Sequence, residues 1–473
     1  MADDLARYGS LRRELEQAVQ PLATSVDGRR FSLRAPLGGA TLQPGGYVLL
    51  DERIGQVTAL RLGEAPGPEI DLEGGRARVT VRMLEGDGVL LDPDTAPFHD
   101  ARVRPAGADD VAAHLERTAA PRARLEVGEL ALASHVPLEL DAGGFDRHTF
   151  LCGQSGSGKT YSLGVILERL LAETSLRVVV LDPNSDFISL GMLREGGGSA
   201  PWEVAVRRAD DGLHLRLLDL DPETQAAMLR LDPVADRDEY AELRAILETE
   251  GAQGILDLER SEIPERRRLW LRIRALGALE WQVWAGPQRT SVIEEVAARD
   301  ARALVLDLGS LGTPEEQALV SAAVLGELWR RRAERKPVLI VIDEAHNVCP
   351  AAPGRPLTAV ATETAIRIAA EGRKFGLHLL VSTQRPQKVH EQVLSQCDNL
   401  VLMRMNSAAD LAHIAATFSF VPPGLLDRAT AFRQGEALVA GKIAPHPALV
   451  RFGARMTAEG GSDVPADWAE LRD

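Results

Sequence analysis

The sequence has few cysteines and no long apolar run, and each shortage excludes a class of protein. Its three cysteines, Cys152, Cys349 and Cys397, are widely spaced in 473 residues, so neither a disulfide framework nor a paired-cysteine metal site is expected. No run of about 18 apolar residues occurs, which argues against a membrane-spanning helix. The charged first residues do not resemble a secretory signal. Together these features predict a cytoplasmic protein.

Positive charge is also in short supply. Lys and Arg total 54 against 69 Asp and Glu, which gives a formal net charge of −15. This balance argues against a protein that coats nucleic acid over its whole surface, but it permits a local basic channel. Arginine triplets at 266–268 and 330–332 are either nucleic-acid contacts or solvated helix faces. The length and the 45% hydrophobic content predict two or three folded domains.

The patterning before residue 147 predicts three segments. Residues 1–28 contain a short amphipathic helix. Residues 29–105 alternate β-rich runs with turn residues at intervals of about ten, which is typical of a small β-barrel. Residues 106–146 form a linker that leads into the rest of the chain.

Residues 147–456 have the pattern of an α/β core, followed by a tail at 457–473. Continuous apolar strands alternate with helix-length segments, which predicts a parallel sheet covered by helices on both faces. Helical periodicity over about 219–300 predicts a helical insertion in that sheet. The predicted strands are 178–182, 303–307, 338–344, 377–383 and 399–404.

A glycine-rich loop opens this core. Residues 153–160 read GQSGSGKT and match GxxxxGK[ST] between a strand-like HTFLC and a helix-like segment. Such a loop wraps backbone N–H groups around nucleotide phosphates, while its lysine adds charge and its hydroxyl ligates Mg²⁺. Lys159 is therefore expected on the phosphates and Thr160 on the metal. The expected ATP-binding residues here are Gly153, Ser155, Gly156, Ser157, Gly158, Lys159, Thr160 and Tyr161.

Two consecutive acids end the apolar strand VLIVIDE. Asp343 is expected to hold Mg²⁺, and Glu344 to orient or deprotonate the attacking water. Gln384 ends the strand LHLLVST and is expected to sense the γ-phosphate, with a turn-forming polar group as the alternative. Asp182 and Asp186 follow another strand, so their carboxylates are expected near the nucleotide.

A cation from a neighbouring subunit can neutralise the charge that develops in phosphoryl transfer. Arg373, in EGRKFG just before the LHLLVST strand, is the residue expected to act in this way, with a solvated surface position as the alternative.

The motifs as a set resemble one family. RHTFLCGQSGSGKT, VVVLDPNSDF, VLIVIDEAHNVCP, EGRKFGLHLLVSTQRP and GEALVAG occur in the order and wording of the HerA branch of the HerA/FtsK ATPases, and the β-rich N-terminal region resembles that family's barrel. The wording NSDF departs from the Gly-Glu-Tyr type of ending that is common there. The role of Asp186 is therefore left open.

The resemblance implies a RecA-like P-loop core in a homo-oligomeric ring, expected to be a hexamer, with ATP sites between subunits and double-stranded DNA in a central channel. By similarity, Arg147 matches a nucleotide-contacting arginine and Lys442 lies where a C-terminal segment closes over the nucleotide. Family members work with a nuclease of the NurA type or with a defence effector. No membrane partner is expected.

Three functions remain open at this point. The first is an ATP-hydrolysing DNA translocase, of the helicase type, that works with a nuclease in DNA-end processing or phage defence. The second is a scaffold or regulatory ATPase of an antiviral effector complex. The third is an FtsK-like or conjugative DNA pump, although membrane helices or a winged-helix reader usually accompany such pumps.

Overall fold

The computed structural model describes residues 2–37, 41–72, 75–92, 94–285 and 290–460. The chain divides into two compact units. The first comprises Met1–Arg122, Glu126–Asp141 and Leu402–Gly453, and the second comprises Ala123–Leu125, Ala142–Val401 and Ala454–Asp473. The expected core of residues 147–456 is thus shared between the two units. Among the described helices, none has the length and apolar character needed to cross a membrane.

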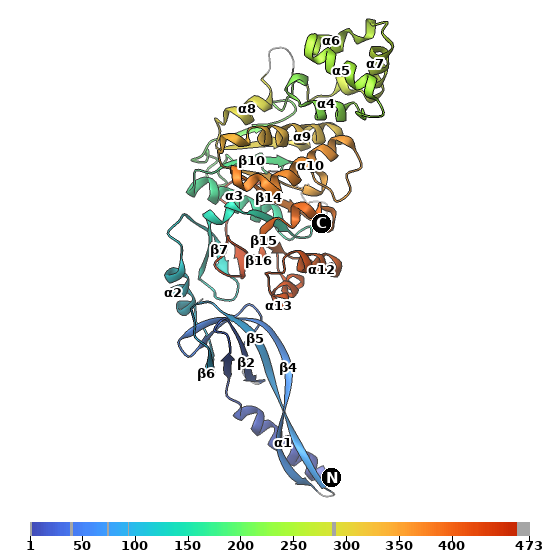
Figure 1. Cartoon of the computed structure of the whole chain (residues 1–473). Helices are drawn as coiled ribbons and strands as arrows, with labels where there is room; N and C mark the ends of the chain where they lie inside the picture. Colours follow the sequence, from blue (N-terminus) through green and yellow to red (C-terminus); the bar gives the residue numbers. More distant parts are fainter. Residues whose placement is uncertain (1, 38–40, 73–74, 93, 286–289, 461–473) are drawn as a thin grey trace, which may run out of the picture. The chain divides into compact units, whose positions relative to one another are not determined.

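Six antiparallel strands of the first unit close on themselves in the order β1-β2-β5-β4-β3-β6 (Figure 1). Alternate residues of β2 are buried, and Phe31, Leu33, Val48 and Val57 pack in the enclosed core. The first strand precedes residue 29, where the β-rich region was expected to begin. The strands are β1 (Leu22–Ser25), β2 (Arg30–Pro36), β3 (Tyr47–Leu50), β4 (Arg53–Leu72), β5 (Gly75–Leu90) and β6 (Phe98–Pro105).

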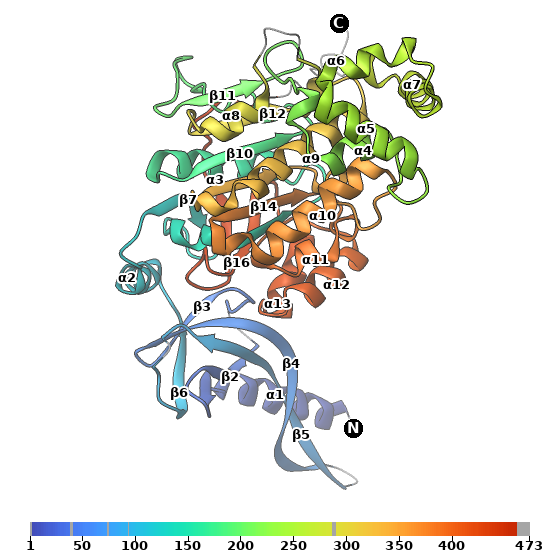
Figure 2. The same ribbon diagram turned by 45° about the horizontal axis from the view of Figure 1, so that its top comes forward.

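Strands β4 and β5 continue beyond this closed sheet as a long two-stranded ribbon (Figure 2). Helix α1 (Ala2–Ala18) packs along it and covers the free edge of β5. The backbone N–H of Thr80 donates to the Tyr8 hydroxyl over 3.2 Å, and that of Arg82 donates to Glu16 Oε1 over 3.2 Å. These side chains satisfy edge donors that would otherwise pair with another strand.

The remaining elements of the first unit are four strands, ordered β16-β17-β7-β8, and three helices. Strand β17 is antiparallel to both β16 and β7. The bounds are α2 (Ala108–Thr118), β7 (Arg124–Leu130), β8 (Pro137–Asp141), α12 (Ala408–Thr417), α13 (Pro423–Leu426), β16 (Glu436–Ala440) and β17 (Ala448–Phe452).

The second unit contains strands in the order β11-β12-β10-β13-β14-β9-β15. The pairs from β11 to β9 are all parallel, as predicted. Every residue of β9, β10, β12, β13 and β14 is buried, because helices cover the sheet. The strands are β9 (His148–Cys152), β10 (Arg177–Asp182), β11 (Val204–Arg207), β12 (Ala303–Asp307), β13 (Val338–Ile342), β14 (Leu377–Thr383) and β15 (Cys397–Met403).

Helix α3 (Lys159–Glu173) follows the glycine-rich loop, and α9 (Pro314–Arg330) packs beside α10 (Pro356–Glu371), as Figures 1 and 2 show. A helical segment lies between β11 and β12, where the insertion was predicted. Its helices are α4 (Pro222–Met228), α5 (Arg237–Thr249), α6 (Gly251–Leu256), α7 (Pro264–Leu276) and α8 (Val292–Ala298). A four-residue helix, α11 (Glu391–Leu394), precedes β15.

The arginine triplets lie on helix surfaces and make ion pairs and ring contacts. In α7, Arg266 contacts Glu242 over 2.6 Å and Arg268 contacts Glu239 over 2.5 Å. At the end of α9, Arg330 pairs with the neighbouring Glu327. The guanidinium of Arg332 lies over the ring of Trp329, at 4.4 Å from its centroid. These contacts favour the solvated helix face over the nucleic-acid contact.

The closed sheet generates a prediction about stability. Phe31 is 3% exposed, so Phe31→Ala removes buried contacts and leaves a cavity that lowers the free energy of unfolding by about 3–5 kcal/mol. Leu62→Ala is the control, because Leu62 is 71% exposed and surface substitutions change stability by about 0.5 kcal/mol or less. Urea unfolding followed by circular dichroism measures both. Equal effects would contradict the assignment of Phe31 to the core.

Candidate functional site

The predicted residues of the glycine-rich loop, with Asp343, Glu344 and Gln384, gather where parallel strands of the second unit end. The glycine-rich loop follows β9, and Gly158 adopts a left-handed conformation, with φ of 91°, immediately before α3. A side chain at this position would be strained, so the glycine lets the chain turn sharply into the helix. Ser155 and Gly156 at the crest of the loop are exposed. Their exposure leaves the crest open to a ligand.

Lys159 reaches from the start of α3 to the ends of two other strands. Its Nζ lies 2.6 Å from Asp343 Oδ1, 3.3 Å from Glu344 Oε1 and 3.1 Å from Ser382 Oγ. The side chain is only 5% exposed. Burial opposes the charged form, but the two carboxylates outweigh it and raise the pKa of Lys159. A buried ammonium is therefore held between two buried carboxylates.

Glu344 lies just after β13 in a left-handed conformation, with φ of 43°. Gln384 Nε2 donates to its Oε1 over 3.0 Å, and His346 Nδ1 lies 3.2 Å from its Oε2. Burial would raise the pKa of Glu344, but His346, Lys159 and Gln384 together lower it to about 2. The carboxylate is consequently ionised and held on three sides.

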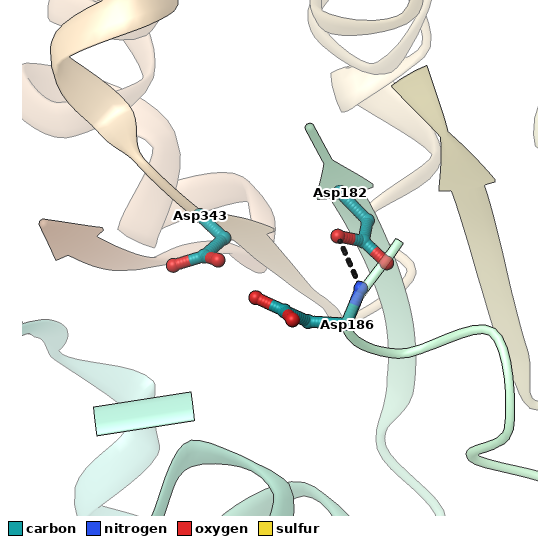
Figure 3. Close-up of side chains that lie close together, drawn as sticks. All are labelled: Asp182, Asp186 and Asp343. Carbon is teal, nitrogen blue, oxygen red and sulfur yellow. Dashed lines mark hydrogen bonds between the residues drawn. The ribbon is translucent and has the colours of Figure 1, made fainter. Parts of the chain in front are cut away.

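Three aspartates meet near Thr160. Asp182, Asp186 and Asp343 place carboxylate oxygens within 4.8 Å of one another (Figure 3). Asp186 Oδ2 accepts from Thr160 Oγ1 over 3.3 Å, and burial, with Asp343 nearby, raises the pKa of Asp186. Asp182 comes from the end of β10 and Asp343 from just after β13. Both are fully buried.

Asp182 shapes the loop that carries Asp186. Its carboxylate accepts from the backbone N–H groups of Asn184, Asp186 and Phe187 over 3.2, 3.0 and 2.8 Å, and Figure 3 shows the bond from Asp186. Burial raises the pKa of Asp182 to about 7. Its oxygens are already used within the chain, so its main effect is to place Asp186 beside Thr160.

The donors fit a magnesium ion. Asp343 Oδ2 is buried and has no hydrogen-bond partner among the described residues. Thr160 Oγ1 and Asp186 Oδ2 are 3.3 Å apart in the same region. Carboxylate and hydroxyl oxygens are ligands that suit Mg²⁺. Asp343 and Thr160 are therefore the residues that could hold the ion.

Arg147 and Arg373 lie where their strands begin, at the end of the sheet opposite to the glycine-rich loop of the same chain. Arg147 precedes β9 and Arg373 precedes β14, whereas the glycine-rich loop and Gln384 follow these strands. Both arginines face Asp398: Arg373 Nη1 lies 2.8 Å and Arg147 Nη1 3.8 Å from its Oδ2. A strand rises about 3.3 Å per residue. Both are therefore separated from their own glycine-rich loop by the length of a strand.

Some contacts of the site were not expected from the motifs. Ser382 contacts Lys159, and His346 contacts Glu344. In the sequence, only the position of these two residues beside the motifs could have suggested these contacts. The Tyr161 hydroxyl accepts from the backbone N–H of Arg455 over 2.7 Å. Lys442 follows β16 in the first unit, and its role stays a prediction.

The amino-acid sequence is similar to one family model and to several named proteins. Residues 125–263 match the family model described as "Helicase HerA, central domain". A protein named DNA double-strand break repair helicase HerA from Pyrococcus furiosus is 24% identical, over 79% of this chain and 77% of its own length. Its namesake from Sulfurisphaera tokodaii is 23% identical, over 88% and 85%. The chain is similar to the HerA-type helicases over most of its length.

Solved structures similar to this chain share its fold. VirB4 of Thermoanaerobacter pseudethanolicus has a TM-score of 0.50 at 17% identity, over 71% of this chain and 97% of its own. The bacterial conjugative coupling protein TrwBΔN70 has a TM-score of 0.51 at 12% identity, over 75% and 93%. With the family-model match and the named relatives, these neighbours identify the chain as an ATP-hydrolysing enzyme with a mixed α/β fold.

The contacts of Asp182 generate a prediction about the stability of the chain. Asp182→Ala removes the acceptor of three backbone N–H groups, so the free energy of unfolding should fall by roughly 1–3 kcal/mol and the loop that carries Asp186 should loosen. Asp210→Ala is the control, since the Asp210 side chain is 82% exposed. Thermal unfolding measures stability, and hydrogen exchange at residues 184–187 reports the loop. Unchanged exchange there would contradict the role given to Asp182.

Proposed function

We propose that this chain is an ATP-driven motor that moves double-stranded DNA through a homo-oligomeric ring. The observation that carries the proposal is the cluster in which Lys159, Asp343, Glu344 and Gln384 meet beside Thr160. Relatives matched over most of this chain are named DNA double-strand break repair helicases. That name supports DNA as the substrate on which the ATPase acts.

The phosphates of ATP would replace the two carboxylates as the partners of Lys159. In the nucleotide-free site, the Lys159 ammonium neutralises Asp343 and Glu344. Bound phosphates would draw it toward the glycine-rich loop, leaving Asp343 and Thr160 to hold Mg²⁺. That ion would neutralise charge on the transferring phosphoryl group. Gly153, Ser155, Gly156, Ser157, Gly158 and Tyr161 complete the proposed ATP site.

Glu344 is proposed to act on the attacking water. A carboxylate with a pKa of about 2 is a weak base, and Lys159 is one cause of that low value. Efficient proton transfer requires a pKa closer to the working pH. Movement of Lys159 onto phosphate would raise the pKa of Glu344 and strengthen it as a base. Gln384 would keep the carboxylate aimed and sense the γ-phosphate.

The assembly is proposed to be a hexamer of RecA-like cores, with the closed six-stranded sheet as the small N-terminal barrel. A nuclease, or an effector in phage defence, is the proposed protein partner. Arg147 and Arg373 lie at the end of the sheet opposite to the glycine-rich loop of their own chain. This position supports a role at the nucleotide of a neighbouring subunit more than at the nucleotide of their own subunit. Lys442 is proposed as a further nucleotide contact.

DNA-dependent ATPase activity tests the proposal. Linear duplex DNA of any sequence should stimulate ATP hydrolysis, and Lys159→Ala, measured as the control, should abolish both basal and stimulated rates. Because binding to phosphates releases counterions, the affinity for DNA should fall steeply between low and high salt. An ATP hydrolysis rate that DNA does not change, or an affinity for DNA that does not depend on salt, would contradict the proposed motor function.

Glu344→Gln should separate nucleotide binding from hydrolysis. The amide keeps the shape of the side chain but cannot take a proton from water, so the hydrolysis rate should fall by about 10²-fold or more. ATP affinity should stay within a few-fold of the parent. Fluorescent-nucleotide titration and phosphate release measure the two quantities. If Glu344→Gln hydrolysed ATP at the parental rate, another group would have to position the attacking water, and Asp186 would be the first residue to examine.

Arg373→Ala should assemble and bind ATP yet lose most hydrolysis, because a contact made in the transition state affects rate more than ground-state affinity. Mixing it with Glu344→Gln subunits should restore part of the activity, since some interfaces then pair an intact Glu344 with an intact Arg373. Arg147→Ala, mixed in the same way, tests the alternative donor. No recovery at any ratio, with mixed assembly confirmed, would count against action in trans.

A further inference from the structure

A segment after β17 crosses the helix that begins at the glycine-rich loop. We call residues 454–460 the strap. Its main chain is bonded to the loop after β10, and its end is tied to Asp186, whose carboxylate contacts Thr160. The bonds are Arg194 N to Met456 O at 2.8 Å, Ala458 N to Met192 O at 2.8 Å and Gly460 N to Asp186 O at 3.1 Å.

Arg455, near the start of the strap, is buried without a complete set of partners. It is 3% exposed, and its Nε donates to Thr457 Oγ1 over 3.1 Å. Its Nη1 and Nη2 are buried and have no hydrogen-bond partner among the described residues. A guanidinium stays charged in a protein, so burial with two unsatisfied nitrogens is costly unless an anion joins them.

Helix α3 has a glycine, Gly164, where the guanidinium of Arg455 packs against it. A Cβ atom at Gly164 would stand 2.5 Å from Arg455 Cζ and 2.7 Å from its Nη1. Any larger residue at this position would push the side chain away. Gly164 lies four residues after Thr160, which is about one helical turn. The guanidinium therefore rests beside the second turn of the helix that begins at the loop.

Two nearby carboxylates, those of Glu168 and Asp186, already accept hydrogen bonds from other groups. Glu168 is fully buried and accepts from the backbone N–H groups of Met456 and Thr457 over 2.8 and 3.0 Å, and from Thr457 Oγ1 over 3.1 Å. Asp186 Oδ2 accepts from Thr160. Burial lowers the pKa of Arg455, although Glu168, Glu459 and Asp186 oppose it. Among the described residues, no carboxylate forms a hydrogen bond with Nη1 or Nη2, so an anionic ligand would satisfy both nitrogens.

We propose that Nη1 and Nη2 of Arg455 bind the α-phosphate of the nucleotide held by the glycine-rich loop. Asp343 and Glu344 contact Lys159 at the start of α3, whereas Arg455 lies about a turn further along, beside Tyr161 and Gly164. This order along the helix assigns Arg455 to the phosphate nearest the ribose. The inference rests on the proposed ATP site, and it adds a cation from the same chain.

Arg455→Met tests the assignment on the full-length protein. Titration calorimetry with Mg²⁺-ATP and Mg²⁺-ADP should show affinities at least about ten-fold weaker for both nucleotides, because both carry the α-phosphate. Without nucleotide, the melting temperature should be unchanged or higher, since an unsatisfied buried charge has been removed. Arg169→Met is the matched control: Arg169 Nη2 also contacts the strap, at Ala454 O over 3.3 Å, and its loss should leave both affinities within about two-fold.

Each other result would overturn the proposal. Unchanged affinities would do so, as would a lower melting temperature with affinity retained, which indicates a structural role. A larger loss for ATP than for ADP would place Arg455 at the γ-phosphate. If Arg455→Met does not fold, Gly164→Ala keeps the charge but displaces the guanidinium, and it should weaken both nucleotides similarly. Failure of the parent chain to bind either nucleotide would reject the ATP site itself, a result separate from any effect of Arg455.

Discussion

The buried ion pair between Lys159 and Asp343 is the constraint on which the rest of the site depends. Strand β14 lies between β9 and β13 in the sheet, so Lys159 must reach past the end of β14 to meet Asp343, and it contacts Ser382 on the way. A buried ammonium is tolerated only with partners of opposite charge. Displacing the end of β9 or of β13 would separate the ammonium from Asp343 and Glu344, and displacing the end of β14 would remove its contact with Ser382.

The core strands and the glycine-rich loop were predictable because their signals are local. A strand buried on both faces of a parallel sheet is apolar throughout, and the loop is a continuous motif. The pairing of Thr160 with Asp186 was not predictable in this way. It depends on Asp182 accepting three backbone N–H groups and on Ser185 adopting a left-handed conformation, with φ of 62°. Neither follows from residue types and spacing alone.

Long-range pairings set a second limit on prediction. Arg147 and Arg373 could be singled out before two strands, but their common partner, Asp398, lies 25 residues from Arg373 and much farther from Arg147 along the chain. The sequence likewise left open whether the arginine triplets contact nucleic acid or form solvated helix faces. In the structure, Arg266 and Arg268 pair with glutamates of another helix and the adjoining turn. Whether a charged side chain is available to a ligand therefore depends on its neighbours in the folded structure, which the sequence does not give.

The contacts that stabilise the nucleotide-free site are also those that ATP would disturb if it binds as proposed. Lys159 cannot satisfy phosphate, Asp343 and Glu344 equally, because moving the ammonium toward one weakens its attraction to the others. Glu344 is also held by Gln384, just after β14, and by His346, whose Nδ1 lies 3.1 Å from Thr383 Oγ1. A shift of Lys159 therefore changes the charge balance at Glu344 and, through it, the residues at the end of β14. At the proposed site, binding of phosphate at α3 would in this way be coupled electrostatically to a neighbouring strand end before any bond of the nucleotide is broken.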